Sequence, residues 1–220
     1  MVLSSTRPGA RTRRPRRSPD DERVLVLDAA ERLFYGRGVQ AVGIDDIRAE
    51  AGVSLKRLYQ LFPSKDGLLV AFLERRDARW RGRLAAFVDA RARDGADPAE
   101  RILAVFDWLG EWFAEPGFRG CAWINSYGEL GGVSDSVAAL ARAHKTAFRA
   151  YLAGLVADAG LRPDLTDELV LLAEGAMVTA GIFATPEPAA QARRAAVALI
   201  ACEVGGGRDP NWRSFSAVSR

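Results

Sequence analysis

The side chains best suited to chemistry in this chain occur in one short stretch, Ser54-Leu-Lys-Arg-Leu-Tyr-Gln60. If this stretch is helical, Leu58 faces the core, while the ammonium, guanidinium, phenol and amide groups face outward. Arginine pairs well with guanine, glutamine with adenine, and an apolar side chain with the methyl group of thymine. We therefore expect Arg57 and Gln60 to contact base edges and Leu55 to contact a thymine methyl group.

The residues before this stretch predict a second short helix and a tight turn. Ile44, Ile47 and Ala51 recur at the spacing of one helix face. Gly52 can adopt the positive φ that a sharp turn needs, and Ser54 can cap the helix that follows. Two short helices joined in this way form the arrangement that places a recognition helix in the DNA major groove.

Helical signals continue along the whole chain and predict about nine helices. A first helix is expected over residues 21–35, and Pro63-Ser64 separates the short recognition helix from a long one over residues 65–93. Further helices are expected over residues 98–115, 119–130, 134–159, 164–183 and 188–204. The predicted fold is all-α, with an N-terminal three-helix DNA-binding domain and a larger C-terminal helical domain.

Boundaries follow from composition. Residues 1–20 carry six arginines and one aspartate, a net charge of +5, and their low apolar content predicts a basic disordered arm. This arm is either a solvated tail or a segment that contacts DNA phosphates or the minor groove. The helix-turn-helix domain is expected over residues 21–67, an effector-binding and dimerisation domain over 68–204, and a disordered tail over 205–220.

Residues 21–75 resemble the TetR/AcrR family of bacterial transcriptional regulators. The resemblance is carried by Asp28-Ala29-Ala30-Glu31-Arg32-Leu33-Phe34, Gly38, Ile44-Asp45-Asp46-Ile47, Ala51-Gly52-Val53-Ser54, Leu58-Tyr59, Phe62 and Ser64-Lys65. It implies a dimer that binds a palindromic operator and responds to a small-molecule effector, most often as a repressor.

The resemblance also implies individual roles in DNA binding. Tyr59 and Lys65 occupy the positions of the family's phosphate contacts, and Gly43 stands where a threonine or serine usually caps the second helix and contacts phosphate. The predicted DNA-binding residues are Gly43, Ser54, Leu55, Lys56, Arg57, Tyr59, Gln60 and Lys65. Leu55 and Leu61 also depart from the family pattern, replacing a common polar residue and a common histidine, and weaken the expected set of contacts.

Two features concern the second domain. Residues 169–183 are apolar nearly all round and residues 195–201 are rich in alanine, which predicts a four-helix dimer interface or, alternatively, a monomer core. Large apolar side chains with a few polar groups are typical of ligand pockets. The expected pocket residues are Trp108, Trp112, Trp123, Asn125, Tyr127, Phe148 and Met177, although aromatic residues also fill ordinary cores.

Composition excludes several other classes of function. With 49% hydrophobic residues the chain is globular, yet no apolar run is long enough for a membrane span. A single histidine, two cysteines and no phosphate-binding loop predict no enzyme, no metal and no cofactor, and the expected location is the cytoplasm. The alternative kept open is a dimeric helical small-molecule-binding protein with a degenerate DNA reader.

Overall fold

The computed structural model describes residues 18–93, 95 and 97–204, and the regular secondary structure of that part of the chain is entirely α-helical. The predicted all-α fold is therefore confirmed. The described residues form nine helices: α1 (Pro19–Arg37), α2 (Ile44–Ala51), α3 (Leu55–Leu61), α4 (Lys65–Arg93), α5 (Pro98–Phe113), α6 (Ala122–Leu130), α7 (Asp135–Asp158), α8 (Leu165–Phe183) and α9 (Glu187–Val204). The predicted tail over 205–220 and the predicted arm up to residue 17 lie outside the described residues.

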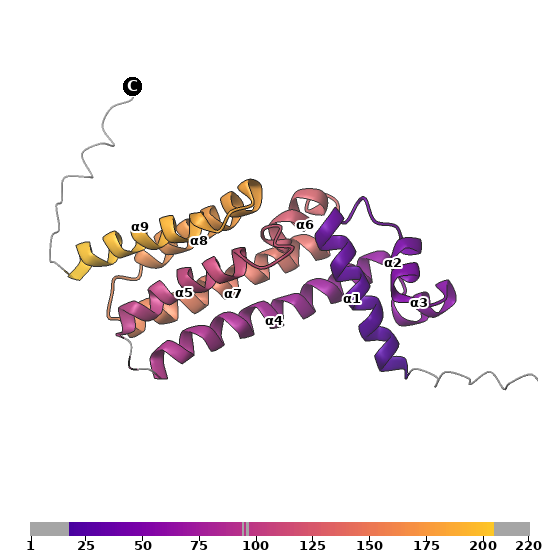
Figure 1. Ribbon diagram of the computed structural model, residues 1–220, viewed down its shortest axis with the longest axis horizontal. Coiled ribbons are helices and arrows are strands. Elements are labelled where there is room, and N and C mark those ends of the chain that lie inside the picture. The colour runs from indigo at the N-terminus through magenta and orange to yellow at the C-terminus, as the bar shows by residue number, and fades with distance from the viewer. Residues whose placement is uncertain (1–17, 94, 96, 205–220) are drawn as a thin grey trace, which may run out of the picture.

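The helices form an elongated molecule with α1, α2 and α3 gathered at one end (Figure 1). From there α4 runs along the length of the molecule and packs against α1, α5 and α7. The pair α8 and α9 lies on the side away from α4. Since α4 is packed against helices of both regions, a movement of α4 relative to α1 changes how the two regions sit on each other.

The first helix begins two residues earlier than predicted. The Ser18 hydroxyl accepts from the Asp21 amide at 3.1 Å, and the Asp21 carboxylate accepts from the Ser18 amide at 3.2 Å, which forms a capping box. Pro19 occupies the first turn, where its missing amide proton is not needed. The last residues assigned to the arm therefore belong to α1.

The predicted turn between the two short helices is confirmed in detail. Gly52 has φ 66° and ψ 37°, in the left-handed region, and ends α2. Ser54 accepts from the Arg57 amide at 3.2 Å and caps α3. Ile47, Ala51 and Leu58 are buried and hold α2 and α3 against the rest of the domain.

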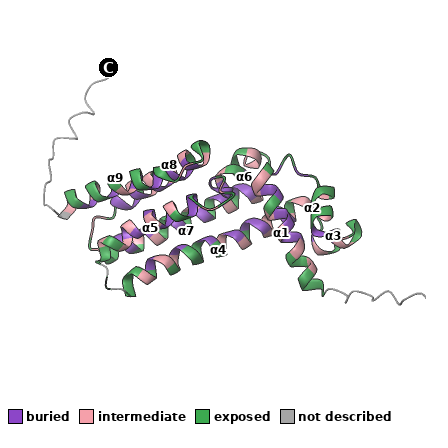
Figure 2. Ribbon diagram, in the orientation of Figure 1, coloured by how far each residue is buried: buried purple, intermediate pink, exposed green. Residues whose placement is uncertain are grey.

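Aromatic side chains fill the core of the larger region. The indole ring of Trp80 lies with its centroid 5.0 Å from Trp108, 5.6 Å from Trp112 and 5.5 Å from Phe148, in edge-to-face contact with each. Figure 2 shows that buried residues occur along most of α4. These rings therefore pack against one another in the core, and Trp80 and Trp112 also border a cavity at its edge.

The only histidine of the chain, His144, is buried in this aromatic core. Its ring stacks on Trp123 with centroids 3.5 Å apart, and its Nδ1 lies 2.6 Å from Oδ1 of Asp77. Burial lowers the pKa of His144 to about 4; Lys145 and Arg81 act in the same direction, and together they outweigh the opposing effect of Asp77.

This pKa predicts that acid destabilises the fold through His144. The unfolded chain binds a proton near pH 6.5, whereas folded His144 does so only near pH 4, so the unfolded state gains stability as pH falls between these values. We expect His144 to contribute a loss on the order of 1 kcal/mol in the free energy of unfolding per pH unit within this window. Urea unfolding of the wild type and of His144→Gln at several pH values measures it, and identical pH slopes for the two proteins would contradict the prediction.

Candidate nucleic-acid interface and effector site

The outer face of α3 carries most of the predicted DNA-binding side chains. Leu55 is 41% exposed and Tyr59 is 45% exposed, and both Lys56 and Gln60 are exposed as well. Leu58 on the opposite face is fully buried. The outward and inward faces of α3 therefore agree with the sequence prediction.

Arg57, a predicted base reader, is held by a partner that the sequence did not reveal. Its Nε donates to Oε2 of Glu22 in α1 at 2.6 Å, and its Nη1 donates to Oε1 of Gln60 at 3.3 Å. The Arg57 side chain is 29% exposed. Both predicted base readers are thus joined in one polar network, and the Arg57 guanidinium shares its charge and its donors with Glu22 and Gln60.

Lys65, a predicted phosphate contact, also forms an internal contact. Its Nζ donates to the Val39 carbonyl at 2.7 Å and lies 5.9 Å from the centroid of the Phe34 ring. The ammonium group therefore ties the start of α4 to the turn between α1 and α2. Its contact with DNA phosphate stays a prediction.

Gly43 precedes α2 at the exposed surface and has no side chain with which to cap it. Its amide instead donates to Oδ2 of Asp46 at 2.9 Å. The neighbouring Arg48 donates to Oδ1 of Asp45 at 2.5 Å. Two carboxylates therefore lie near this helix end, and a phosphate group that approaches Gly43 meets a partly negative surface.

Hydrogen bonds from α6 hold the turn between α1 and α2. The Glu129 carboxylate accepts from the Val39 amide at 3.1 Å and from the Gln40 amide at 2.8 Å, while the Gln40 side chain donates to the Glu129 carbonyl at 2.7 Å. At Gly38 φ is 87°, and a Cβ there would lie 3.0 Å from Oε1 of Glu129. Nothing in the sequence around Gly38 or Glu129 indicates this contact, which joins segments about 90 residues apart.

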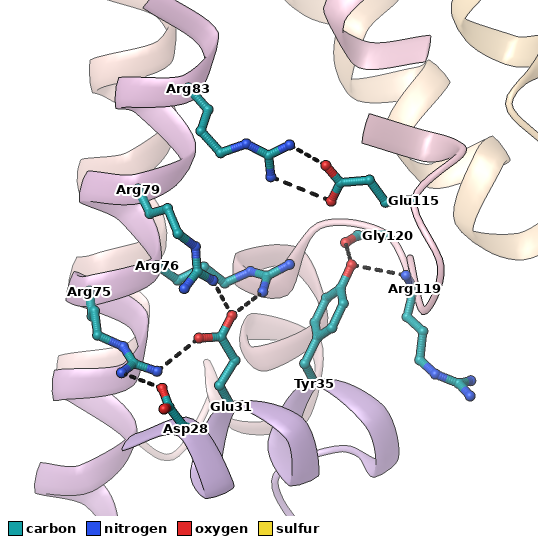
Figure 3. Close-up of polar contacts among 10 residues, drawn as sticks. All are labelled: Asp28, Glu31, Tyr35, Arg75, Arg76, Arg79, Arg83, Glu115, Arg119 and Gly120. Atoms are coloured by element: carbon teal, nitrogen blue, oxygen red, sulfur yellow. Dashed lines mark hydrogen bonds and ion pairs between the residues drawn. The ribbon is translucent and has the colours of Figure 1, made fainter. Parts of the chain in front are cut away.

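A second contact between the regions is made by Tyr35 near the end of α1. Its hydroxyl donates to the Gly120 carbonyl at 2.8 Å and accepts from the Arg119 amide at 2.9 Å (Figure 3). Burial raises the pKa of Tyr35, so the hydroxyl keeps its proton at neutral pH. Together with Glu129, Tyr35 fixes the position of the helix-turn-helix region on the larger region.

The seven predicted effector-pocket residues do not surround one cavity. Five of them are at most 4% exposed and belong to the packed core: Trp108, Trp112, Trp123, Phe148 and Met177. Asn125 and Tyr127 are exposed on α6, and Asn125 donates to the Arg119 carbonyl at 2.9 Å. These aromatic residues pack mainly against each other, and the assignment of the seven residues to an effector pocket stays a prediction.

Open space occurs at several places, of which one is the boundary between the two regions. A cavity of about 580 Å³ lies between α1, α4 and the segment that joins α5 to α6. A shallower apolar groove of about 410 Å³ runs beside Trp123 and Tyr127, between α6 and α7. Of the predicted pocket residues, only Trp112 lines the larger cavity.

The described residues contain no cluster of histidine, cysteine and carboxylate side chains that could hold a metal ion. Within the same part of the chain, no helix combines the length and the apolar character needed to cross a membrane.

Comparison with known proteins identifies the family. The family model for bacterial regulatory proteins of the tetR family matches residues 26–72. The crystal structure of SCO4454, a TetR-family transcriptional regulator from Streptomyces coelicolor, is 30% identical with a TM-score of 0.73, and the match covers 84% of this chain and 96% of that one. A tetR-type regulator from Streptomyces avermitilis, sav143, is 34% identical with a TM-score of 0.64, over 82% of this chain and 98% of the other.

A curated relative matches a shorter segment. The HTH-type transcriptional regulator Rv1255c of Mycobacterium tuberculosis is 34% identical over 124 residues, which make up 54% of this chain and 58% of the relative. The chain thus matches little more than half the length of this relative, whereas it matches nearly all of the two Streptomyces structures. The fold, the helix-turn-helix region and these similarities agree, and the chain belongs to the TetR family of DNA-binding transcriptional regulators, which are not enzymes.

Proposed function

We propose that the protein is a ligand-responsive repressor that binds a palindromic operator as a dimer and releases it when a small apolar or amphipathic effector binds. The observation that carries this proposal is the exposed outer face of α3. The helix-turn-helix region that contains α3 is attached to the larger region by the hydrogen bonds of Glu129 and Tyr35. A ligand that alters the larger region can therefore change the position of α3.

Base reading is assigned to Arg57 and Gln60, with Leu55 contacting a thymine methyl group. Backbone binding is assigned to the remaining predicted residues: Gly43, Ser54, Lys56, Tyr59 and Lys65. Phosphate contacts fix the register of a protein on DNA, and base contacts select the sequence. We further propose that residues 21–67 form the DNA-binding domain and residues 68–204 the effector-binding and dimerisation domain, joined by α4.

An uncovered apolar face of α8 supports the proposed dimer. Leu171 and Ile182 are each 72% exposed and Val178 is 40% exposed, and their spacing along α8 places them on one side of the helix. Val197 on α9 is 40% exposed. Apolar side chains on two adjacent helices match the predicted four-helix interface, in which a second copy covers them.

Operator selection tests the proposal directly. The purified protein is incubated with random duplex DNA, and the retained fragments are sequenced. We expect an inverted repeat whose half-sites are about 34–36 Å apart, one helical turn of DNA, because two copies of α3 enter successive major grooves. Failure to enrich any sequence would overturn the repressor proposal in favour of a dimeric small-molecule-binding protein with a degenerate reader, for which the internal contacts of Arg57 and Lys65 provide the support.

The ion pair of Arg57 gives a test of base reading. Arg57→Ala should relax the preference at one base position by about 1–3 kcal/mol. Glu22→Gln should instead tighten operator binding, because the Arg57 guanidinium is no longer partly neutralised by a carboxylate. Affinities for the selected operator and for its single-base variants measure both effects. Arg32→Ala, which breaks the exposed pair of Arg32 with Glu50 in the same domain, is the matched control.

Tyr59→Ala should weaken binding to the operator and to random DNA by the same factor, since phosphate contacts are independent of sequence. Equal behaviour of Arg57→Ala and Tyr59→Ala on these two DNAs would contradict the division of roles. Lys65 is less suitable for this comparison, because its loss also removes the hydrogen bond to Val39.

The dimer interface is tested by a single charge on α8. Val178→Glu should shift the protein to monomers, because dimerisation would bury an unpaired carboxylate. Val133→Glu, at a position 83% exposed that precedes α7, is the control and should stay dimeric. Sedimentation velocity distinguishes the species, and a dimeric Val178→Glu protein would place the interface elsewhere.

A further inference from the structure

The cavity between α1, α4 and the α5–α6 segment combines aromatic walls with arginine side chains. Its aromatic residues are Tyr35, Trp80, Trp112 and Phe118. Five arginines and three carboxylates also line it, which gives the lining a net charge of +2. A space of about 580 Å³ with this lining suits a compact ligand that has a flat apolar body and a negative charge.

Among the carboxylates that line the cavity, Glu31 contacts the largest number of arginines. Glu31 of α1 accepts hydrogen bonds from three arginines of α4: Arg75 at 3.0 Å, Arg76 at 2.7 Å, and Arg79 (Figure 3). Burial would raise the pKa of Glu31, but these arginines outweigh it and lower the pKa below its usual value. Arg75 also donates to Asp28 at 2.8 Å, whereas Arg76 and Arg79 form their described ion pairs with Glu31 alone, so a ligand carboxylate can take over part of the set that Glu31 holds.

Hydrogen-bond donors at the cavity are left without acceptors. Nε1 of Trp80 and Nε of Arg76 are buried and have no partner among the described residues, although both side chains line the cavity and are at most 8% exposed. The guanidinium of Arg119 forms no ion pair with any described residue and extends away from Glu31 (Figure 3). Leaving a buried donor unsatisfied costs about 1–3 kcal/mol, whereas the exposed guanidinium of Arg119 is open to an incoming anion.

Arg79 and Arg83 are the groups best placed to meet an incoming anion. Their side chains are 47% and 49% exposed, so they can change partner without opening the core. Arg83 now pairs with Glu115, and Arg79 pairs with Glu31 (Figure 3). Arginine binds carboxylates through two parallel hydrogen bonds, which favours a carboxylate over a neutral group of the same shape.

We propose that this cavity is the effector site and that it takes an aromatic carboxylic acid, with the ring between the aromatic walls and the carboxylate on Arg79 and Arg83. The consequence for DNA rests on the proposed function. A ligand carboxylate that draws Arg79 from Glu31 removes one of the ion pairs between α1 and α4, and a ring placed beside Tyr35 presses on α1 directly. Both effects move the helix-turn-helix region relative to α4.

Calorimetry and tryptophan fluorescence with 2-naphthoate test the site without DNA. The neutral isostere 2-naphthamide and inorganic phosphate are the comparison ligands. We expect 2-naphthoate to bind with a change in tryptophan emission, since Trp80 and Trp112 line the cavity, and to bind roughly tenfold or more tightly than either comparison ligand. Equal affinity for the acid and the amide would overturn the proposed charge recognition, and tighter binding of phosphate would show an anion site without aromatic recognition.

The variant Arg79→Gln/Arg83→Gln should lose roughly tenfold or more in affinity for 2-naphthoate while the amide is unaffected. Arg91→Gln, on the same helix but outside the cavity lining, is the matched control and should bind as the wild type does. Thermal unfolding of all variants verifies that they are folded. Unchanged affinity in the double variant, or no binding of 2-naphthoate at millimolar concentration, would overturn the inference.

Release of the selected operator is then measured separately with the acid and the amide. If the operator is selected but the acid does not bind, the site assignment fails and the DNA-binding function stands. If the acid binds with the expected dependence on Arg79 and Arg83 but no operator is selected, the site stands and the repressor proposal fails. Because the two measurements share no readout, each failure can be attributed to its own proposal.

Discussion

The half-buried carboxylate of Glu31 is the interaction on which the arrangement of this protein depends. Its side chain is 15% exposed, and a charge at that depth is tolerated only where it is paired and hydrogen-bonded. The guanidinium groups come from three positions of α4, so the charge of α1 can be satisfied only when α1 lies across that helix. The orientation of the whole helix-turn-helix region therefore depends on pairing the charge of Glu31. Tyr35, one helical turn later on α1, adds the contact with Gly120 that prevents rotation about this point.

The side chains on the predicted DNA-binding surface are held in place by contacts within the protein. Arg57 is joined to Glu22, Lys65 to Val39, and the turn before α2 to Glu129. Ordered side chains lose less conformational entropy on binding than mobile ones, but a contact of Arg57 with DNA competes with its ion pair with Glu22. In the base-reading role that we propose for Arg57, this competition favours a base that accepts hydrogen bonds from the guanidinium.

The sequence predicts the structure correctly where a feature depends only on residues that are close together in the chain. The turn at Gly52, the cap at Ser54 and the inward face at Leu58 depend on neighbours within a few residues, and the structure has all three as predicted. Contacts between residues that are far apart in the sequence could not be predicted in this way. Glu129 lies 90 residues from Val39, and nothing in either segment indicates that a carboxylate and an amide will meet. The aromatic residues of the second domain are ambiguous markers of a pocket for a different reason: Trp108 and Phe148 have the same composition signature whether they line a cavity or pack against Trp80.

The dense packing of this aromatic core limits where a ligand can bind. A ligand seated among Trp80, Trp108 and Phe148 would have to displace closely packed rings, and interiors at this density resist insertion. At the boundary between α1 and α4 the space already exists, and the side of the boundary that faces it is lined by ion pairs that an anion can exchange, while buried side chains such as Phe34 and Phe72 keep the two helices packed. The two states of the boundary then differ mainly in which carboxylate occupies the arginines of α4. A ligand shifts an equilibrium only as far as it binds the two states unequally, and competition for these arginines provides that inequality.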